Sequence, residues 1–217
     1  MVNFSLIVTA GGTSSRFGNS NKLLELINER PVIEYTVNKF INFDNIKQII
    51  IPANISIQEE LKSLFDNNKK IKIVLGGNTR QESVYKGLQF VDTEFVIIHD
   101  GARPLIDNKT INSVMLEVER HNAVSVMTKT TDTIKEVDET GKIIRTIDRS
   151  YLFNTQTPQA FRTAVIKEAH EKLKDKNYTD DASLLEELGI PVYSVIGEYT
   201  NIKITTKSDL DFAKIYI

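Results

Sequence analysis

Two cationic side chains, Arg16 and Lys22, follow a glycine-bearing turn close to the start of the chain. The surrounding residues 8–24 read VTAGGTSSRFGNSNKLL and continue a short apolar run. Their spacing fits neither a Walker loop nor a G-x-G-x-x-G dinucleotide fingerprint. Consecutive backbone N–H groups in such a turn can bind an anion, and a guanidinium and an ammonium suit phosphate oxygens. A tight strand-to-helix connection with two solvated cations is the alternative interpretation.

The segment GGNTRQES is a second polar cluster, and it also follows an apolar, β-prone run. Asn78 or Thr79 is suited to cap the helix that follows, and Glu82 would complete a capping box. Gly77 has no side chain, so its backbone could hydrogen-bond the edge of a nucleotide base. Ser83 lies one turn into the predicted helix. A nucleotide site and a purely local helix cap are therefore both open for this segment.

The segment HDGARP forms a third cluster, directly after the apolar residues EFVII. Asp100 stands at the end of this run, where a carboxylate would orient a ligand or bind a magnesium ion together with phosphate oxygens. An Asx-type turn before Gly101 is the structural alternative. His99 is one of three histidines, and we assign it no role.

The amino-acid composition limits the chemistry and the ligands that these clusters could serve. The chain has 217 residues, no cysteine and a formal net charge of -2. The lack of cysteine excludes disulfides, thiolate zinc sites and cysteine nucleophiles, and is compatible with a reducing compartment. The charge argues against non-specific binding to nucleic acid or membranes, so an anionic ligand must meet local cations. With no leader-like segment and no apolar stretch near about 18 residues, we expect a cytoplasmic protein.

Apolar, β-branched runs alternate with amphipathic segments over most of the chain. The predicted strands are residues 4–9, 47–52, 72–75, 94–99, 123–128 and 192–196. The predicted helices are residues 31–42, 55–65, 81–90, 106–120, 162–174 and 182–188, with a closing helix that has a capping signature at residues 206–209. This alternation predicts an α/β fold with a parallel, doubly wound sheet covered on both faces. We expect a single domain over residues 1–217.

The alternation breaks at residues 130–150. Two polar, β-prone segments flank the turn-forming residues DETG, which is typical of a β-hairpin. Their charged side chains leave little apolar surface to pack on a core, and an isolated hairpin is marginally stable. We infer a protruding arm that leans on a second subunit. An ordinary edge hairpin is the alternative.

The three polar clusters follow strands, and ligands of open α/β sheets bind beyond the carboxyl ends of the strands. Backbone donors, arginine, lysine and aspartate gathered there suit phosphoryl or nucleotidyl transfer, where positioning and charge neutralisation do most of the catalysis. A phosphate monoester acceptor would be mostly dianionic at neutral pH and need no general base. It would need cations, namely Arg16, Lys22 and Mg2+.

The motifs resemble, in order, those of the 2-C-methyl-D-erythritol 4-phosphate cytidylyltransferases. They read TAGGTSSR with Lys22, GGNTRQESVYKGL, HDGARP, TDTIK, IDRSYLFNTQTPQAF, TDDAS and NIKITT. The resemblance runs over essentially the whole chain, and seven motifs in order are specific although each alone is weak. It implies a Rossmann-like fold of the nucleotide-diphospho-sugar transferase type. It also implies transfer of CMP from CTP to 2-C-methyl-D-erythritol 4-phosphate, with release of pyrophosphate, in the non-mevalonate route of isoprenoid biosynthesis.

The resemblance assigns roles by position. It implies that Arg16 and Lys22 stabilise the transition state. The residues implied to bind CTP are Ala10, Gly11, Gly12, Thr13, Gly77, Asn78, Ser83 and Gly101. The residues implied on the acceptor side are Asp100, Arg103, Thr179 and Lys203, with Asp100 also the candidate metal ligand. Thr133 and Arg149 match arm residues that enter the partner's site in the family, which implies a homodimer.

Several positions depart from the family pattern. Thr9, Gly11 and Ser14 differ from the usual first loop, Asn78 replaces a common aspartate, and Thr131 replaces a common basic residue. The sequence AGG-x-SSR is closer to the corresponding motif of the ribitol-phosphate cytidylyltransferases and of the molybdopterin nucleotidylyltransferases. Ribitol 5-phosphate is therefore the alternative acceptor. A non-catalytic nucleotide-binding or dimerisation module is the alternative of another class, although binding alone would not need both cations.

Overall fold

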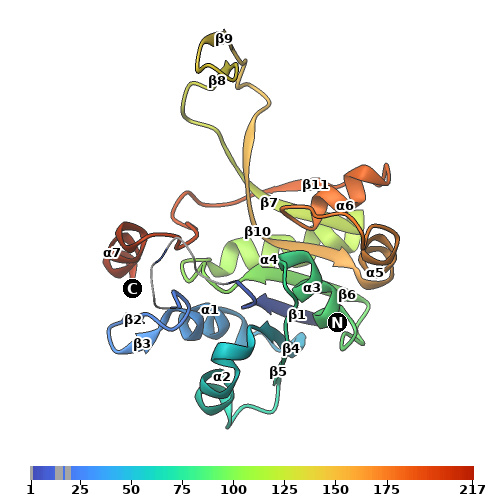
Figure 1. The fold of residues 1–217 in the computed structure, drawn as a ribbon. Helices are drawn as coiled ribbons and strands as arrows, with labels where there is room; N and C mark the ends of the chain where they lie inside the picture. The colour runs from blue at the N-terminus through green and yellow to red at the C-terminus, as the bar shows by residue number, and fades with distance from the viewer. Residues whose placement is uncertain (1, 13–16, 18–20) are drawn as a thin grey trace.

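The computed structural model describes residues 2–12, 17 and 21–217, and its central feature is a seven-stranded sheet (Figure 1). The strands lie in the order β11-β7-β10-β6-β1-β4-β5. They are β1 (Phe4–Thr9), β4 (Ile46–Ala53), β5 (Ile71–Leu75), β6 (Phe95–Asp100), β7 (Ala123–Lys129), β10 (Phe153–Arg162) and β11 (Tyr193–Ile196). The pairs that involve β10 are antiparallel, and the other neighbours in this sheet are parallel. The prediction of a mostly parallel α/β sheet is confirmed.

Helices cover both faces of the sheet. One face packs against α1 (Val32–Ile41), α2 (Gln58–Phe65), α4 (Asn108–His121) and α7 (Lys207–Tyr216). The other face packs against α3 (Arg80–Leu88), α5 (Thr163–Lys172) and α6 (Ala182–Glu187). A 3-10 turn, η1 (Ile55–Ile57), precedes α2, and the short strands β2 (Leu26–Ile27) and β3 (Arg30–Pro31) form a separate hairpin. None of the described helices is long and apolar enough to cross a membrane.

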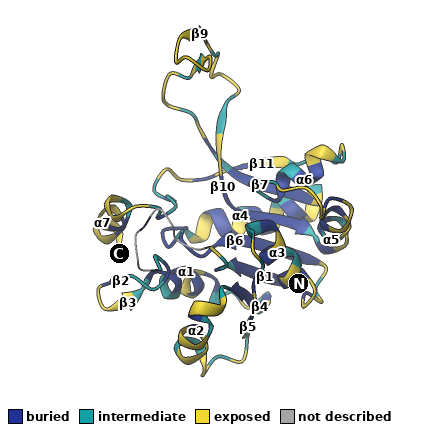
Figure 2. Ribbon diagram, viewed as in Figure 1, coloured by how far each residue is buried: buried dark blue, intermediate teal, exposed yellow. Residues whose placement is uncertain are grey.

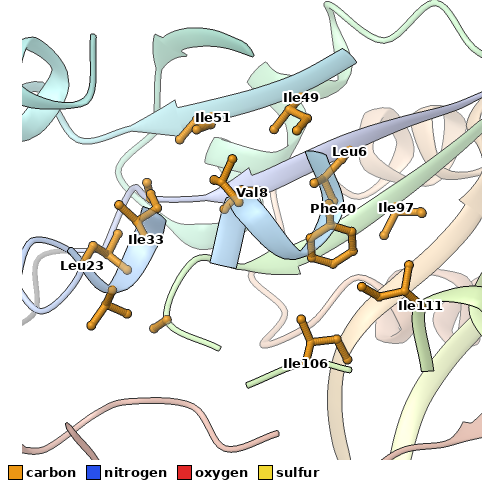
Figure 3. Close-up of a cluster of buried hydrophobic side chains, with 14 of the residues drawn as sticks. Leu6, Val8, Leu23, Ile33, Phe40, Ile49, Ile51, Ile97, Ile106 and Ile111 are labelled. Carbon is orange, nitrogen blue, oxygen red and sulfur yellow. The ribbon is translucent and has the colours of Figure 1, made fainter. Parts of the chain in front are cut away.

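The alternation of side chains along β1 explains why the sheet is sandwiched. Leu6 and Val8 point into one apolar cluster, where Phe40 of α1 packs against them (Figure 3). Ile7, between them in sequence, belongs to the opposite cluster together with Val84 of α3. A strand that is buried on both faces needs apolar side chains in both directions, which is why this run is continuously apolar. Figure 2 shows the sheet as the buried centre of the molecule.

Local capping signals position the helix ends as predicted. Thr206 caps α7, and its side chain and that of Asp209 form a reciprocal capping box. Thr79, and not Asn78, caps α3, because its hydroxyl accepts from the Glu82 N–H at 3.0 Å. The Glu82 carboxylate reaches one residue further back and accepts from the Asn78 N–H at 2.6 Å. Most predicted elements exist, with ends that differ by a few residues.

The sequence analysis missed strand β10, which lies in the middle of the sheet between β6 and β7. Its residues FNTQTPQAFR are largely polar and contain Pro158, and proline is normally excluded from central strands. The structure accommodates it by an irregularity, because pairing with β7 is interrupted between Thr155 and Gln159. The two halves of β10 thus pair normally, and the polar residues between them are left to face the site described below.

A hairpin arm protrudes from the sheet beyond β7 and β10 (Figure 1). It carries β8 (Lys135–Val137) and β9 (Ile143–Thr146), which pair in antiparallel fashion. Val137, Ile143 and Ile144 are each more than half exposed on it. The hairpin predicted at residues 130–150 is therefore present, and among the described residues these three apolar side chains stay largely exposed.

Candidate active site

The carboxyl ends of β1 and β6 form the switch point of the sheet. Numbered along the chain, β5, β4, β1 and β6 follow the order 3-2-1-4, so that the connections from β1 and β6 leave in opposite directions. Ligands of doubly wound sheets bind in the crevice at this point. The Gly101 N–H donates to the Thr9 carbonyl at 3.1 Å, and a Cβ at Gly101 would lie 2.8 Å from that oxygen. Only glycine allows the two strand ends to approach so closely.

A first cavity, of about 250 Å³, opens at this switch point, and we call it the glycine cavity. It is lined by Thr9, Gly11, Gly12, Lys22, Leu23, Asn78, Thr79, Arg80, Ser83, Asp100, Gly101, Ala102 and Lys203. Five of the residues that the sequence analysis assigned to the nucleotide are among them, together with Lys22. Segments far apart in sequence therefore converge as predicted.

Close packing of backbone shapes the glycine cavity. A Cβ at Gly11 would lie 2.3 Å from the Ser83 hydroxyl oxygen, so that any side chain there would force Ser83 away. The Ser83 hydroxyl accepts from the Gly77 N–H at 3.0 Å and donates to the Thr79 carbonyl at 2.8 Å. Ala10 donates its N–H to the Pro52 carbonyl at 3.1 Å. The N–H groups of Gly77 and Ala10 are thus already used within the protein, contrary to the expectation that they face a ligand.

A second cavity, of about 380 Å³, adjoins the first, and we call it the cationic cavity. Its lining is Arg80, Asp100, Arg103, Thr155, Gln156, Thr157, Thr179, Asp180, Ser183, Glu186 and Lys203. The four residues predicted on the acceptor side are all among these. Arg80, Asp100 and Lys203 line both cavities, so they mark the junction between the two spaces.

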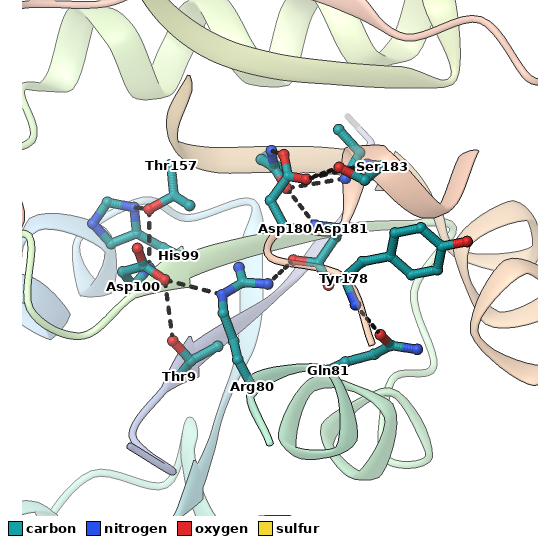
Figure 4. Close-up of polar contacts among 12 residues, drawn as sticks. Thr9, Arg80, Gln81, His99, Asp100, Thr157, Tyr178, Asp180, Asp181 and Ser183 are labelled. Carbon is teal, nitrogen blue, oxygen red and sulfur yellow. Dashed lines mark hydrogen bonds and ion pairs between the residues drawn. The ribbon is translucent and has the colours of Figure 1, made fainter. Parts of the chain in front are cut away.

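Asp100 is the centre of a cluster of charges at the junction, and Figure 4 shows its contact with one of them, Arg80. Its Oδ1 lies 3.3 Å from Arg80 Nε, and its Oδ2 lies 3.3 Å from Arg103 Nε and 2.9 Å from Lys203 Nζ. Burial alone would raise the pKa of this carboxyl, but the charges of Arg80, Lys203 and Arg103 outweigh burial and hold the pKa well below its usual range. Arg80 is shared with a second buried carboxylate, so two buried carboxylates face three cations at the junction, and the remaining positive charge is suited to an anionic substrate.

Arg80 connects Asp100 to a second buried carboxylate. Its Nη1 lies 2.8 Å from Asp181 Oδ2, and His170 Nε2 lies 3.2 Å from Asp181 Oδ1. Burial disfavours the charge on Arg80, but Asp181 and Asp100 outweigh it and raise the pKa of the guanidinium. No site role was predicted from the sequence for either Arg80 or Asp181. Arg80 lines both cavities, and Asp181 lies buried next to it.

His99 lies behind Asp100 and holds the neighbouring loops. Its Nδ1 accepts from the Thr157 hydroxyl at 3.1 Å, and its Nε2 lies 3.1 Å from the Arg103 carbonyl. The Asp100 N–H donates to the same Thr157 oxygen at 3.0 Å. Burial lowers the pKa of His99 to about 4, so the ring is neutral at physiological pH and donates from Nε2. Nothing in the sequence pattern indicated Thr157, which sits in the missed strand β10.

We predict that His99 makes the protein less stable as the pH falls from 6.5 to about 4. The unfolded chain binds a proton at a pKa near 6.5, whereas the folded protein resists it until about pH 4. The loss is on the order of 3 kcal/mol in the free energy of unfolding. Urea unfolding over this range should show the slope in the native protein and a much weaker slope in His99→Gln. Equal slopes in the two proteins would contradict the account.

The donor set at Asp100 does not fit a divalent cation. Both carboxylate oxygens already face the side-chain nitrogens of Arg80, Arg103 and Lys203, so a metal ion at that carboxylate would meet three fixed positive charges. Within the described part of the chain, no group of three or more histidine, cysteine or acidic side chains could hold a metal. The expectation that Asp100 ligates the metal therefore finds no support in this geometry.

The two predicted arm residues lie away from the cavities. Thr133 and Arg149 are exposed on the arm and line neither cavity, and the Arg149 guanidinium donates to the Thr131 carbonyl. Thr13 and Arg16 lie outside the described residues. The chain alone thus brings the nucleotide and acceptor candidates together, and leaves the two arm residues apart from them.

A mostly parallel sheet with a glycine-lined and a cationic cavity at its switch point defines an α/β enzyme of the phosphoryl- or nucleotidyl-transfer class. Residues 4–217 match the family model described as 2-C-methyl-D-erythritol 4-phosphate cytidylyltransferase. A curated protein of that name from Dictyoglomus thermophilum is 44% identical over 213 residues, which cover 94% of this chain and 92% of the relative. The chain belongs to this family.

Solved structures agree with the assignment. A 4-diphosphocytidyl-2C-methyl-D-erythritol synthase from Anaerococcus prevotii superposes with a TM-score of 0.88 and 32% identity, over 99% of this chain and 98% of that one. The 2-C-methyl-D-erythritol 4-phosphate cytidylyltransferase of Francisella tularensis gives a TM-score of 0.85 at 29% identity, over 99% and 100% of the two chains. The fold and the family predicted from the motifs are confirmed.

Proposed function

We propose that this chain transfers CMP from CTP to 2-C-methyl-D-erythritol 4-phosphate, in the synthesis of isoprenoid precursors. The products are 4-diphosphocytidyl-2-C-methyl-D-erythritol and pyrophosphate. Membership of the family makes the chain a cytidylyltransferase. The observation that carries the proposal is the pair of adjoining cavities, one suited to a nucleotide and one to an anionic polyol, which meet at Arg80, Asp100 and Lys203.

The reaction needs charge neutralisation more than proton transfer. An oxygen of the acceptor phosphate attacks the α-phosphorus of CTP, and the bond from that phosphorus to the bridging oxygen breaks as pyrophosphate leaves with the electron pair. The acceptor is mostly dianionic at neutral pH, so no base is required. Two unit charges about 4 Å apart repel by about 4 kcal/mol at an effective dielectric of 20. Cations around the junction offset this repulsion.

Each side of the junction has its own residues in this proposal. Lys22, on the wall of the glycine cavity, and Arg16 neutralise the triphosphate and stabilise the developing charge on phosphorus. Gly11 packs directly against Ser83, and Gly12, where a Cβ would meet no described atom within 4 Å, borders the open space for the nucleotide. The residues proposed to bind the acceptor from this chain are Asp100, Arg103, Thr179 and Lys203.

Magnesium is part of the proposal as a companion of CTP. Held by triphosphate oxygens and water, as Mg2+ commonly is, it would neutralise negative charge on the nucleotide. The carboxylate of Asp100 is occupied by cations and is left out of its coordination. A cytoplasmic location completes the proposal, since a chain without cysteine is compatible with a reducing compartment.

We further propose a homodimer in which the arm completes the partner's site. The arm exposes apolar side chains at Val137, Ile143 and Ile144, and Tyr151 at its base is 91% exposed. Exposed apolar side chains of this kind favour burial against another chain. The arm also carries Thr133 and Arg149 away from the cavities of its own chain, which is what a contribution to a second chain requires.

The arm proposal predicts an asymmetric effect of Arg149→Ala. The apparent Michaelis constant for the acceptor should rise by roughly tenfold or more, because a phosphate contact is lost, while that for CTP should change little. Steady-state pyrophosphate release with each substrate varied in turn measures both constants. Equal changes in the two constants would contradict the placement of Arg149 at the acceptor.

The activity itself is tested by pyrophosphate release from CTP and Mg2+ with a panel of polyol phosphates. We expect release with 2-C-methyl-D-erythritol 4-phosphate and none with CTP alone. Release with ribitol 5-phosphate only would assign the chain to the ribitol-phosphate alternative. Binding of CTP without consumption of any acceptor would support the non-catalytic module and contradict the proposal.

A further inference from the structure

Arg80 is held at the junction of the two cavities by contacts in two directions. Its Nε faces Asp100 at the end of β6, and its Nη1 faces Asp181 in the segment before α6. Figure 4 shows the guanidinium lying between these two carboxylates. Because Arg80 is the first residue of α3, its side chain links this helix to the end of β6 and to the segment before α6.

Of the two carboxylates, that of Asp100 lines the cationic cavity, and that of Asp181 is buried beside residues that line it. Asp100 forms the wall at β6, together with Arg103 and Lys203. Asp181 directly follows Thr179 and Asp180, which form the other wall. The same segment is tied to α3 once more, because the Tyr178 N–H donates to Gln81 Oε1 at 2.9 Å. The first two residues of α3 therefore both contact the segment at residues 178–181, and Arg80 also contacts Asp100 on the other side of the cavity.

Stability alone does not account for this arrangement. A buried ion pair contributes little net stability, because the loss of hydration offsets the attraction between the charges. The Nη2 of Arg80 is in addition buried without a hydrogen-bond partner, which is unfavourable. A guanidinium can bridge two carboxylates in fixed directions, whereas an ammonium acts as a single point charge.

We propose that Arg80 is a positioning residue for the acceptor. Through Asp100 and Asp181 it fixes both walls of the cationic cavity at the spacing that the polyol phosphate requires. The inference rests on the proposed function, and it adds a residue that acts through the two carboxylates that it bridges. The glycine cavity keeps its glycines and Ser83 without this bridge, so the acceptor should depend on Arg80 more than CTP does.

The test compares Arg80→Lys and Asp181→Asn with the native protein in pyrophosphate release. Lysine keeps the charge but cannot bridge both carboxylates, and asparagine removes one anchor without changing the size of the side chain. We expect kcat/KM for 2-C-methyl-D-erythritol 4-phosphate to fall by about tenfold to a hundredfold in each variant. The dissociation constant of CTP, measured by calorimetry, should stay within about threefold. Arg120→Lys, on the exposed surface of α4, is the control and should behave as the native protein.

A double variant shows whether Arg80 and Asp181 act through one bridge or independently of each other. If both residues act through one bridge, Arg80→Lys combined with Asp181→Asn should be no worse than the more severe single variant. Additive losses, an unchanged kcat/KM for the acceptor, or equal losses for CTP and acceptor would each overturn the inference. Loss of CTP binding in both single variants would assign Arg80 to stability and overturn it as well. Absence of turnover in the native protein would instead refute the proposed function.

Discussion

Replacing Lys22 by alanine is expected to lower turnover by about a hundredfold or more, which corresponds to about 2.7 kcal/mol of transition-state stabilisation. Lys22 lines the glycine cavity, and its ammonium would face the phosphorus where two anions meet. An interaction made only in the transition state lowers kcat and kcat/KM together when it is removed. Stopped-flow or steady-state pyrophosphate release measures both constants, and circular dichroism checks that the fold is retained.

Lys39→Ala is the matched control, because Lys39 is an exposed lysine on α1 away from both cavities. Its turnover should equal that of the native protein. Arg16→Ala should lose turnover to a similar extent as Lys22→Ala, although Arg16 lies outside the described residues. Unchanged turnover in either of these two variants would remove that residue from the transition-state role.

Asp100→Asn is expected to destabilise the fold by about 3–5 kcal/mol, the cost of breaking a buried ion pair. The carboxylate is 4% exposed, and its removal leaves Arg80, Arg103 and Lys203 without their common counterion. Calorimetric or urea unfolding at neutral pH measures the loss. Because this carboxyl has a depressed pKa, its contribution is complete above its unfolded pKa of 3.8 and disappears as the pH falls further.

The control for this variant is Asp211→Asn, whose ion pair with Lys214 lies on the surface of α7. Its stability should change by less than about 1 kcal/mol, since exposed ion pairs contribute little. The anion pyrophosphate should stabilise Asp100→Asn more than it stabilises the native protein, because the junction becomes more positive. A stability loss in Asp100→Asn no larger than in Asp211→Asn would show that the three cations do not depend on Asp100.

The parallel part of the fold could be predicted because its signals are local. Continuous apolar runs such as that of β1 and caps such as Thr206 are visible in a short window of sequence. Strand β10 could not be found in this way, because its polar residues are buried by pairing with β6 and β7 and not by their own hydrophobicity. Pairing with two neighbouring strands outweighs the tendency of proline, here Pro158, to be excluded from central strands.

The candidate site was predictable to the extent that its residues sit at strand ends. Gly11, Asp100 and Ser83 could be expected to converge, because parallel strands bring their carboxyl ends to one edge. Arg80 and Asp181 could not be paired, since 101 positions separate them and each has a plausible local role near a helix start. Which N–H groups remain available to a ligand, as at Gly77, also depends on contacts that only the folded chain defines.

The account is tested most directly by a crystal structure with 2-C-methyl-D-erythritol 4-phosphate and a CTP analogue whose α–β bridge is a methylene group, so that no reaction occurs. We predict the base and ribose beside Gly11 and Ser83, and the phosphate of the acceptor at the junction of the two cavities, facing the α-phosphorus across the space near Lys22. An acceptor phosphate bound away from that junction, or a triphosphate that avoids Lys22, would contradict the central claim that the two cavities bring mutually repelling anions together for nucleotidyl transfer.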